Sequence, residues 1–455
     1  MGGCNIKRIL ILLLCIGFSY LLAASIRKAA RGVVKTVDFG AIYYEARCAI
    51  EHKDPYEPRI VMGEFESDGG RISTKTPREA RENRTIISVA VYPPTALLVA
   101  VPFAFAPWPV AREVWVGLIT SLFVLAAYLI WDMSSEAPIL SGYILSFILL
   151  NCFVVILAGN PAGVVVPCCV IAVWCFVKQR YAALGAILLA VALALKPHDA
   201  GFIWLYFLVA RGPGRRRALQ TLGIIAVLGI CAYFWITAAS PHWIRELHNN
   251  LAVVSARGST SDPGPSGLDE RGMSPIISLQ NAASVFGDDP NVYNAVSYAI
   301  GGGLILIWAF AALLKRFTTE GAKLALAAIS ALGLLPVYHR PDDAKLLILT
   351  IPACALMWAA GRAKRWLALG LTSAAVIFTS DGPVMLWTAA TNGLASSGST
   401  LSGKLALMLI QPAPLVLLAM GCFYLWVYIR YQPSSVDETI RDTMVSTASG
   451  QPKAI

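Results

Sequence analysis

The chain has 455 residues, of which 57% are hydrophobic and only 14% are charged, and its formal net charge is +10. Soluble domains carry about 25% charged residues, so the composition excludes a soluble globular protein and predicts an all-α polytopic membrane protein. The positive charge does not indicate a nucleic-acid partner, because much of it lies in short links between apolar segments instead of on one soluble face. Membrane lipids are the expected surroundings.

About twelve segments (between about 11 and 13) are apolar enough for membrane helices, and many approach the roughly 20 residues that a helix needs to cross the hydrocarbon. Their expected ranges are 6–26, 110–131, 139–158, 160–177, 181–195, 199–210, 218–238, 292–314, 321–338, 344–360, 365–380 and 404–429. The first range could instead be a signal peptide. Its apolar stretch exceeds the usual ~7–15 residues, so we interpret it as an uncleaved helix.

Residues 95–107 form a further apolar run that contains Pro102 and Pro107. A helix of about 13 residues is only about 20 Å long. We therefore interpret this run as a re-entrant or interfacial segment, with a full span as the alternative.

The links between the segments alternate between two kinds. One kind is rich in Lys and Arg: 178–180, 211–217, 315–316, 361–365 and Arg430. The other carries acids, amides, histidines and tyrosines: 38–56, 92–94, 159–160, 196–199 and 339–343. Short basic loops stay in the cytoplasm, so the second kind should meet on the extracytoplasmic face of a multi-pass protein of the cell membrane.

This topology gives one membrane domain, residues 1–431, with large outer loops at 27–91 and 239–291 and both termini in the cytoplasm. Residues 432–455 form a polar tail that we expect to be disordered. The basic residues between 27 and 35 oppose this orientation. In the alternative, 95–107 spans the membrane, the N-terminus lies outside, and Asp38 is cytoplasmic and separated from His339.

Asp38 is the leading candidate for chemistry, because a carboxylate at the membrane boundary can take a proton from a hydroxyl nucleophile. An N-cap of a helix is the alternative role. His339 and Arg340 could bind a phosphate, since the guanidinium offers a fork of donors. Lys196 and His198 form a second cationic group, although a lysine near the interface can also simply extend toward water.

Asn160 could bind a sugar hydroxyl or cap the helix that follows it, which has Pro161 in its first turn. Asp342 and Asp343 could hold Arg340, cap a helix or bind sugar hydroxyls. The sequence lacks a phosphate-binding loop, a zinc-protease helix motif and a nucleophile elbow. A membrane-borne donor therefore fits better than a soluble nucleotide sugar, and we expect no cofactor and no required metal.

Several of these motifs occur in an ordered series over about residues 30–360. The series consists of Asp38-Phe39 with Tyr43-Tyr44 and Asp54-Pro55-Tyr56, then Tyr92-Pro93-Pro94, Ala111 with Trp115, Gly159-Asn160, Leu195-Lys196-Pro197, and His339 before Asp342-Asp343. In this order they resemble glycosyltransferase family 87, within the GT-C group of polytopic transferases. Two details differ from the pattern: Asn160 stands where Gln is expected, and Arg340-Pro341-Asp342 follows the histidine where an aromatic residue and then Asp are expected.

The resemblance implies a GT-C-type bundle with an extracytoplasmic first loop, and an inverting mannosyltransferase that uses a polyprenyl-phosphate-mannose donor. Asp38 matches the family's first-loop general base, and His339 resembles its later outer-loop histidine. The expected acceptor is a hydroxyl of a lipid or glycan. Expected donor phosphate ligands are Arg340, His339, Lys196 and His198, and expected sugar or acceptor contacts are Asn160, Tyr43, Tyr92, Asp342 and Asp343. A transporter or flippase of lipid-linked saccharides is the alternative.

Overall fold

The computed structural model describes residues 36–72, 77–259, 261–264, 276–361, 363–391 and 408–432. Over these ranges the chain is helical, with a single isolated β-bridge between Arg211 and Arg316. The all-α prediction is therefore confirmed. The expected first helix at 6–26 and almost all of the expected tail lie outside the described residues.

Five helical runs in the described chain are long and apolar enough to cross a membrane. They are α6 (Trp108–Met133), α7 with α8 (Pro138–Leu150 and Phe153–Ala158), α12 (Arg215–Ala239), α15 to α16 (Pro290–Ser297, η2 Tyr298–Gly302, and Gly303–Leu314) and α22 (Ala413–Arg430). They match five of the expected spans; α22 begins at Ala413, and residues 404–407 of the last expected span lie outside the described residues. A polytopic membrane protein is consistent with this set.

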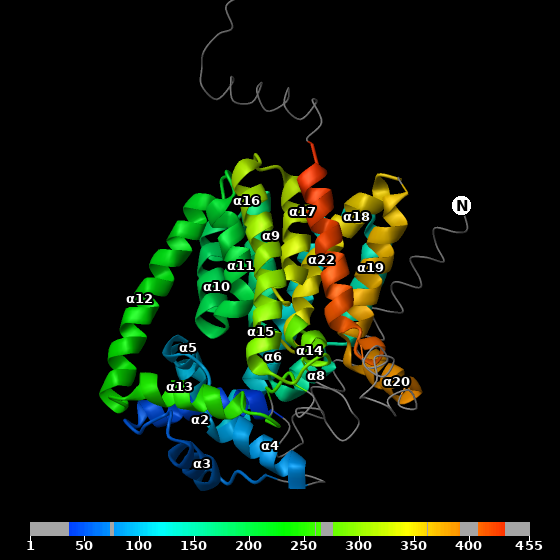
Figure 1. Cartoon of the computed structure of the whole chain (residues 1–455). Helices are drawn as coiled ribbons and strands as arrows, with labels where there is room; N and C mark the ends of the chain where they lie inside the picture. Colours follow the sequence, from blue (N-terminus) through cyan, green and yellow to red (C-terminus); the bar gives the residue numbers. More distant parts are fainter. Residues whose placement is uncertain are drawn as a thin grey trace, which may run out of the picture.

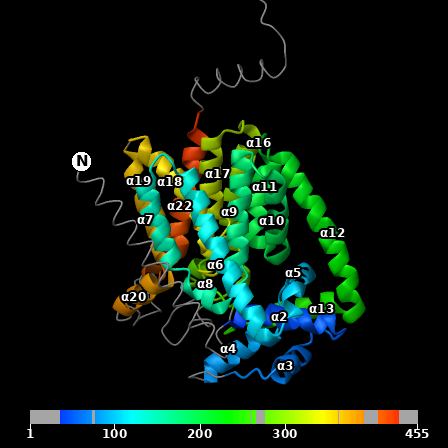
Figure 2. The ribbon, with the colours of Figure 1, turned by 180° about the vertical axis from the view of Figure 1, so that it is seen from behind.

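Shorter helices fill the other expected ranges. They are α9 (Ala162–Lys178), α10 (Ala182–Leu195), α11 (Pro197–Val209), α17 (Thr319–Leu332), η3 with α18 (Asp343–Thr350 and Ile351–Ala359) and α19 (Lys364–Phe378). Helices α9 and α17 are almost completely buried and form the centre of the bundle (Figure 1). From behind, α6 runs along the bundle between α7 and α9 (Figure 2). The total of twelve crossings stays a prediction.

Helix α17 ends at Leu332, whereas the expected segment continued to residue 338. Pro336 and Pro341 explain the difference, because proline lacks the amide donor and disfavours helical geometry in the residue before it. The chain between α17 and η3 therefore forms an irregular loop, and this loop carries His339 and Arg340.

The run expected at 95–107 is the helix α5 (Pro94–Ala104), which has 11 residues. Such a helix is only about 16 Å long. It packs against α10, α12 and the first described helix, α2 (Val37–Ile50). A short re-entrant or interfacial segment remains the interpretation that fits this length.

Both large loops fold into helices at one end of the bundle, the lower end in Figure 1. The first contributes α2, α3 (Pro58–Ser67) and α4 (Pro77–Ser88), and the second contributes α13 (Trp243–Val254) and α14 (Leu279–Ser284); α20 (Asp381–Thr391) lies near the same end. Asn250 on α13 donates hydrogen bonds to the carbonyls of Tyr56, at 3.0 Å, and Ala90, at 3.1 Å. These bonds join the two loops.

The basic links gather at the opposite end. Arg211 pairs with Arg316 through the β-bridge, and the Lys315 ammonium donates to the carbonyl of Tyr431 at 2.7 Å. The Lys364 ammonium lies 4.1 Å from the centre of the Trp426 ring. The alternation of links along the sequence therefore corresponds to two chemically different ends of the bundle.

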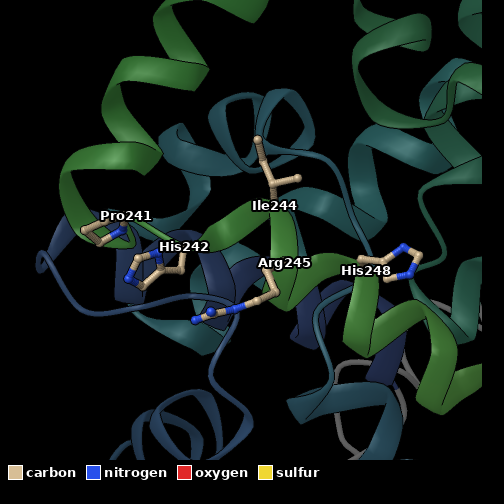
Figure 3. A pocket seen from close by; sticks show the side chains of 5 residues that line it. All are labelled: Pro241, His242, Ile244, Arg245 and His248. Carbon is tan, nitrogen blue, oxygen red and sulfur yellow. The ribbon is translucent and has the colours of Figure 1, made fainter.

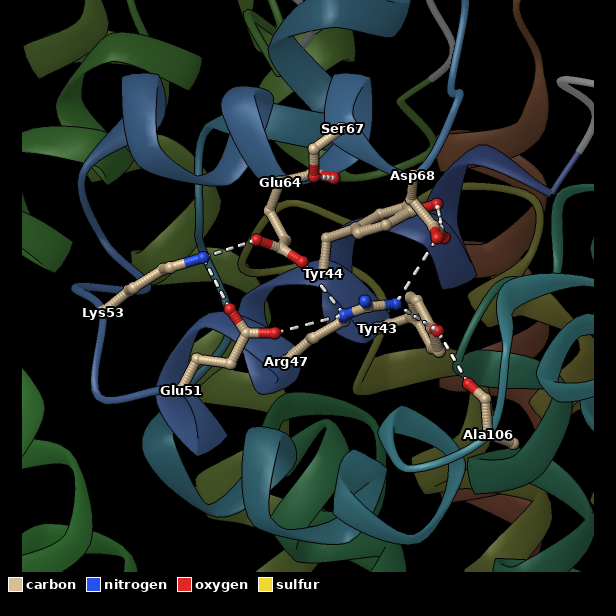
Figure 4. A network of polar contacts seen from close by, with 9 residues as sticks. All are labelled: Tyr43, Tyr44, Arg47, Glu51, Lys53, Glu64, Ser67, Asp68 and Ala106. Atoms are coloured by element: carbon tan, nitrogen blue, oxygen red, sulfur yellow. Dashed lines mark hydrogen bonds and ion pairs between the residues drawn. The ribbon is translucent and has the colours of Figure 1, made fainter.

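An ion-pair network fastens α3 to α2 (Figure 4). The Glu64 carboxylate accepts from the Arg47 guanidinium at 2.9 Å and from the Lys53 ammonium at 2.8 Å. Asp68 accepts from the Tyr44 hydroxyl at 3.2 Å. Only 6% of Glu64 is exposed, and a buried carboxylate requires such cationic partners.

Helix α13 carries a shallow groove of about 500 Å³, lined by Pro241, His242, Ile244, Arg245 and His248 (Figure 3). Its apolar residues Ile244, Leu251 and Val253 are exposed, whereas Asn250 is buried. Exposed apolar side chains beside basic ones are typical of a helix at a membrane–water interface. None of the predicted site residues lines this groove.

Candidate active site

Aromatic stacking positions Asp38, which lies in the first turn of α2. The neighbouring Phe39 is completely buried and stacks on Trp115 at 4.6 Å between ring centres and on Trp108 at 5.6 Å. The Trp115 indole donates to the carbonyl of Gly159 at 2.8 Å. The start of α2 is thus fixed between α6 and the residues just before α9.

Gly159 permits this close approach. Its φ of +66° lies in the left-handed region that favours glycine. A Cβ atom at this position would lie 2.8 Å from the Cβ of Phe39, closer than two carbon atoms can pack. The Gly159-Asn160 pair of the sequence series therefore has a structural reason: the glycine turns the chain and presents Asn160 to Asp38.

Asn160 joins two carboxylates that are far apart in the sequence. Its Nδ2 donates to Asp38 Oδ2 at 2.7 Å and lies 3.4 Å from Asp342 Oδ2. Its Oδ1 accepts from the amide of Ala162 at 2.9 Å, near the start of α9. Pro161 is the N-cap residue itself, but Asn160 accepts from the first amide of α9 in the manner of a cap and also contributes to the polar site, so the two roles that the sequence left open are compatible.

The charges around Asp38 favour its ionised form more than those around Asp342. Burial raises the pKa of Asp38, whereas the positive charge of Arg340 and the hydrogen bond from Asn160 lower it. For Asp342, burial and then the charge of Asp38 raise the pKa to about 7. Two neighbouring carboxylates do not ionise independently. We expect Asp38 to lose its proton first, as a base must.

Lys196 is already paired in this structure. Its ammonium donates to Asp343 Oδ1 and lies 3.4 Å from Asp199 Oδ2. The other oxygen of Asp343 accepts from the backbone amide of Arg340 at 2.9 Å. Asp343 therefore orders the 340–343 turn and neutralises the lysine. Among the nearby cations, Arg340 lowers the pKa of Asp38 the most. Arg340 is therefore a stronger candidate than Lys196 for binding a phosphate beside the Asp38 carboxylate.

His339 and His198 face one carboxylate. The Asp199 Oδ1 lies 3.4 Å from His339 Nε2 and 3.7 Å from His198 Nε2. Asp199 was not among the expected site residues, since an acid in the first turn of a helix is common and interacts favourably with the helix dipole. The signal available in the sequence was its place directly after Lys196-Pro197-His198.

The two expected tyrosines differ. Burial and the charge of Asp38 raise the pKa of Tyr92, and Lys196 lowers it, so Tyr92 belongs to the same polar group. Tyr43 is completely buried, and its hydroxyl donates to the carbonyl of Ala106 at 2.8 Å. This packing indicates a structural role for Tyr43, and its expected contact with the sugar or acceptor stays a prediction.

The structure thus brings together residues from five parts of the chain at one end of the bundle. They are Asp38 and Tyr92, Asn160, the 196–199 turn, and the 339–343 loop. A carboxylate available as a base lies near a cluster of cations and amide or hydroxyl donors. This combination suits transfer of a group between a hydroxyl and an anionic leaving group.

A model of glycosyltransferase family 87 matches residues 90–337, which is just over half of the chain. The chain belongs to this family. The match includes Tyr92, Asn160 and the 196–199 turn, but it ends before His339 and begins after Asp38. No significant match was found among curated proteins or among solved structures.

Family membership identifies the molecule as a membrane glycosyltransferase, an enzyme that moves a sugar from a donor to an acceptor. The apolar helices agree with a location in the membrane. The predicted family is therefore confirmed. The donor, the sugar, the acceptor and the roles of individual residues belong to the proposal that follows.

Proposed function

We propose that this transferase moves a hexose, with mannose as the first candidate, from a polyprenyl-phosphate donor to a hydroxyl of a lipid or glycan on the extracytoplasmic face. The observation that carries the proposal is the bridge from Asp38 through Asn160 to Asp342, with the charge of Arg340 acting on Asp38. The proposed base thus lies within the electrostatic influence of the side chain proposed to bind the phosphate.

In the proposed reaction Asp38 takes the proton of the acceptor hydroxyl. The acceptor oxygen then bonds to the anomeric carbon of the donor as the bond between that carbon and the phosphate oxygen breaks. The electron pair leaves with polyprenyl phosphate, and a single displacement of this kind inverts the anomeric configuration. Asn160 holds Asp38 Oδ2, which leaves Oδ1 for the proton.

Arg340 stabilises the charge that develops on the leaving phosphate, because fixed cations are most effective where charge appears in the transition state. Asn160, Tyr92 and Asp342 form the side of the site that contacts the sugar or acceptor. Asp343 and Lys196 neutralise each other and position the 340–343 turn.

The placement of the chemistry favours a transferase over the transporter alternative. Transporters bind their substrates near the middle of the membrane, between repeated halves. Here the candidate residues gather where α2 meets the start of α9, and the basic links gather at the other end. The positive-inside rule assigns the basic end to the cytoplasm, and this supports an extracytoplasmic site.

The experiment uses the full chain, purified and reconstituted in lipid nanodiscs, with radiolabelled polyprenyl-phosphate-mannose as donor and a membrane lipid extract as acceptor. We expect label to appear in a product that is more polar than the acceptor and has the inverted anomeric configuration. Polyprenyl-phosphate-glucose tests the sugar, and GDP-mannose tests a soluble donor. Transfer from GDP-mannose without transfer from the prenyl donor would refute the proposal.

A further inference from the structure

Three side chains from two separate segments converge beside the candidate site. His198 and Asp199 begin α11, and His339 lies in the loop before η3. One nitrogen or oxygen atom from each lies within 4.8 Å of the corresponding atoms of the other two. The set is thus two imidazoles and one carboxylate, the donor combination that divalent transition metals prefer.

The hydrogen bonding of His339 makes this cluster unusual. Its Nδ1 lies 3.0 Å from the carbonyl oxygen of Val337, and a carbonyl can only accept, so Nδ1 carries the proton. In the neutral ring Nε2 then holds a lone pair. That lone pair faces Asp199 Oδ1 at 3.4 Å. Two acceptors at this distance repel each other unless a proton on Nε2 or a metal cation lies between them.

Asp199 and His339 are both deeply buried, and burial raises the free-energy cost of a contact between two acceptors. Asp199 is 2% exposed and His339 is 0% exposed. Within the described chain, Asp199 has ion-pair contacts but neither of its carboxylate oxygens has a hydrogen bond, and Nε2 of His339 has none either. Buried polar atoms without hydrogen bonds are rare, and a bound ion is one arrangement that would satisfy them.

We propose that His198, Asp199 and His339 bind a divalent transition-metal ion of the zinc class. For bonds of about 2.1 Å, the ligand atoms of a tetrahedral site lie about 3.4 Å apart. The two distances from Asp199 Oδ1, 3.4 Å and 3.7 Å, agree with that spacing. Small movements of the side chains are sufficient to complete the geometry.

The surroundings of the three ligands are those of a metal site. A histidine ligand normally donates its other N–H to a carbonyl or a carboxylate, as His339 does to Val337. Lys196 lies 3.4 Å from the second oxygen of Asp199 and so orients the carboxylate. The ammonium also pairs with Asp343, so these three charged groups carry one net negative charge, which does not oppose a cation.

The role of the ion rests on the proposed function. Three protein ligands leave at least one coordination position open, as in catalytic sites and unlike closed structural ones. We assign that coordination position to an oxygen of the donor phosphate. Arg340, which directly follows the ligand His339, would lie close to the same phosphate. The metal would then share the neutralisation of the leaving group with the guanidinium.

The test measures metal binding without donor or acceptor, so its outcome is independent of transferase activity. Full-length protein carrying a tag free of histidine is purified without chelator, and its metal content is determined by mass spectrometry. We expect about one equivalent of a divalent transition metal per chain. After removal with a chelator, titration with Co²⁺ should restore one saturable site with visible absorption bands.

Asp199→Asn and His198→Ala should each weaken Co²⁺ binding at least about tenfold. His248→Ala, on α13, is the matched control and should bind as the wild type does. Because Asp199→Asn could fail to fold, thermal unfolding of the chelated wild-type protein with and without ZnCl₂ is measured as well, and an upward shift in the melting temperature is expected. Protein without metal that also fails to bind Co²⁺ and is not stabilised by ZnCl₂ would overturn the proposal and identify an imidazolium–carboxylate pair instead.

Discussion

Replacing Asn160 with serine isolates one hydrogen bond of the proposed site. A serine hydroxyl can still accept from the amide of Ala162 and cap α9, but it is too short to donate to Asp38 as Nδ2 does at 2.7 Å. Hydrogen bonds to a charged group contribute about 1.5–3 kcal/mol, and about 1.4 kcal/mol corresponds to one pKa unit. The pKa of Asp38, already raised by burial, should rise by a further one to two units or so.

The sign of the effect on activity follows from the role of a base. Asp38 must be ionised, so transfer is lost as the pH falls through its pKa. In Asn160→Ser the acidic limb of the rate profile should therefore lie about one to two pH units higher. At a pH below both limbs, the variant should transfer label about ten- to a hundredfold more slowly than the wild type.

The assay is the initial rate of label transfer from about pH 4 to pH 8. Asn160→Ala is the comparison variant, since it also removes the cap and should cost about 1 kcal/mol of stability, which a thermal unfolding measurement detects. An acidic limb at the same pH as in the wild type, whatever the change in rate, would refute the link between Asn160 and the ionisation of Asp38.

Three further predictions concern the surroundings of the site. Burial raises the pKa of Glu45 from its ordinary value of 4.5 to about 8. The contribution of the protonated side chain to the free energy of unfolding is therefore complete below pH 4.5 and is lost as the pH rises from there to about 8. The wild type should lose thermal stability over that range more steeply than Glu45→Gln, and equal slopes would contradict this. Glu64→Gln removes a buried charge from two cations and should lower the free energy of unfolding by about 2–3 kcal/mol, whereas the exposed Glu66→Gln should leave it nearly unchanged; equal melting temperatures would rule out a stabilising network. Arg340→Gln should raise the pKa of Asp38 and reduce transfer by about 10² or more, and a rate within a few-fold of the wild type would exclude Arg340 from phosphate binding.

The positions of most helices could be predicted from the sequence, because apolar length and proline placement largely determine them. Pro138 and Pro197 begin α7 and α11, where a missing amide donor has no cost. The helices of the outer loops were less evident, since α3 and α4 are short and mostly polar. Pro58 and Pro77 at their first positions were the available signal.

The candidate site was partly predictable for a different reason. The order of Asp38, Asn160 and the 339–343 loop along the chain, together with the alternation of basic links, was enough to expect that they meet. The pairing of Lys196 with Asp343 was not predictable, because it joins residues 147 positions apart and depends on how α10 and α11 pack. The burial of Tyr43, an expected sugar or acceptor contact, likewise depends on the packing of α2.

The most direct test of the account is the transfer rate of Asp38→Asn, measured with the prenyl-phosphate donor in nanodiscs. Asp132→Asn is the matched control, since Asp132 lies near the end of α6, about 25 Å along the helix from Trp115. The account predicts a loss of about 10²–10⁴ in rate for Asp38→Asn, with donor binding retained and the control unaffected. Turnover by Asp38→Asn close to that of the wild type would contradict the central claim that this carboxylate is the base.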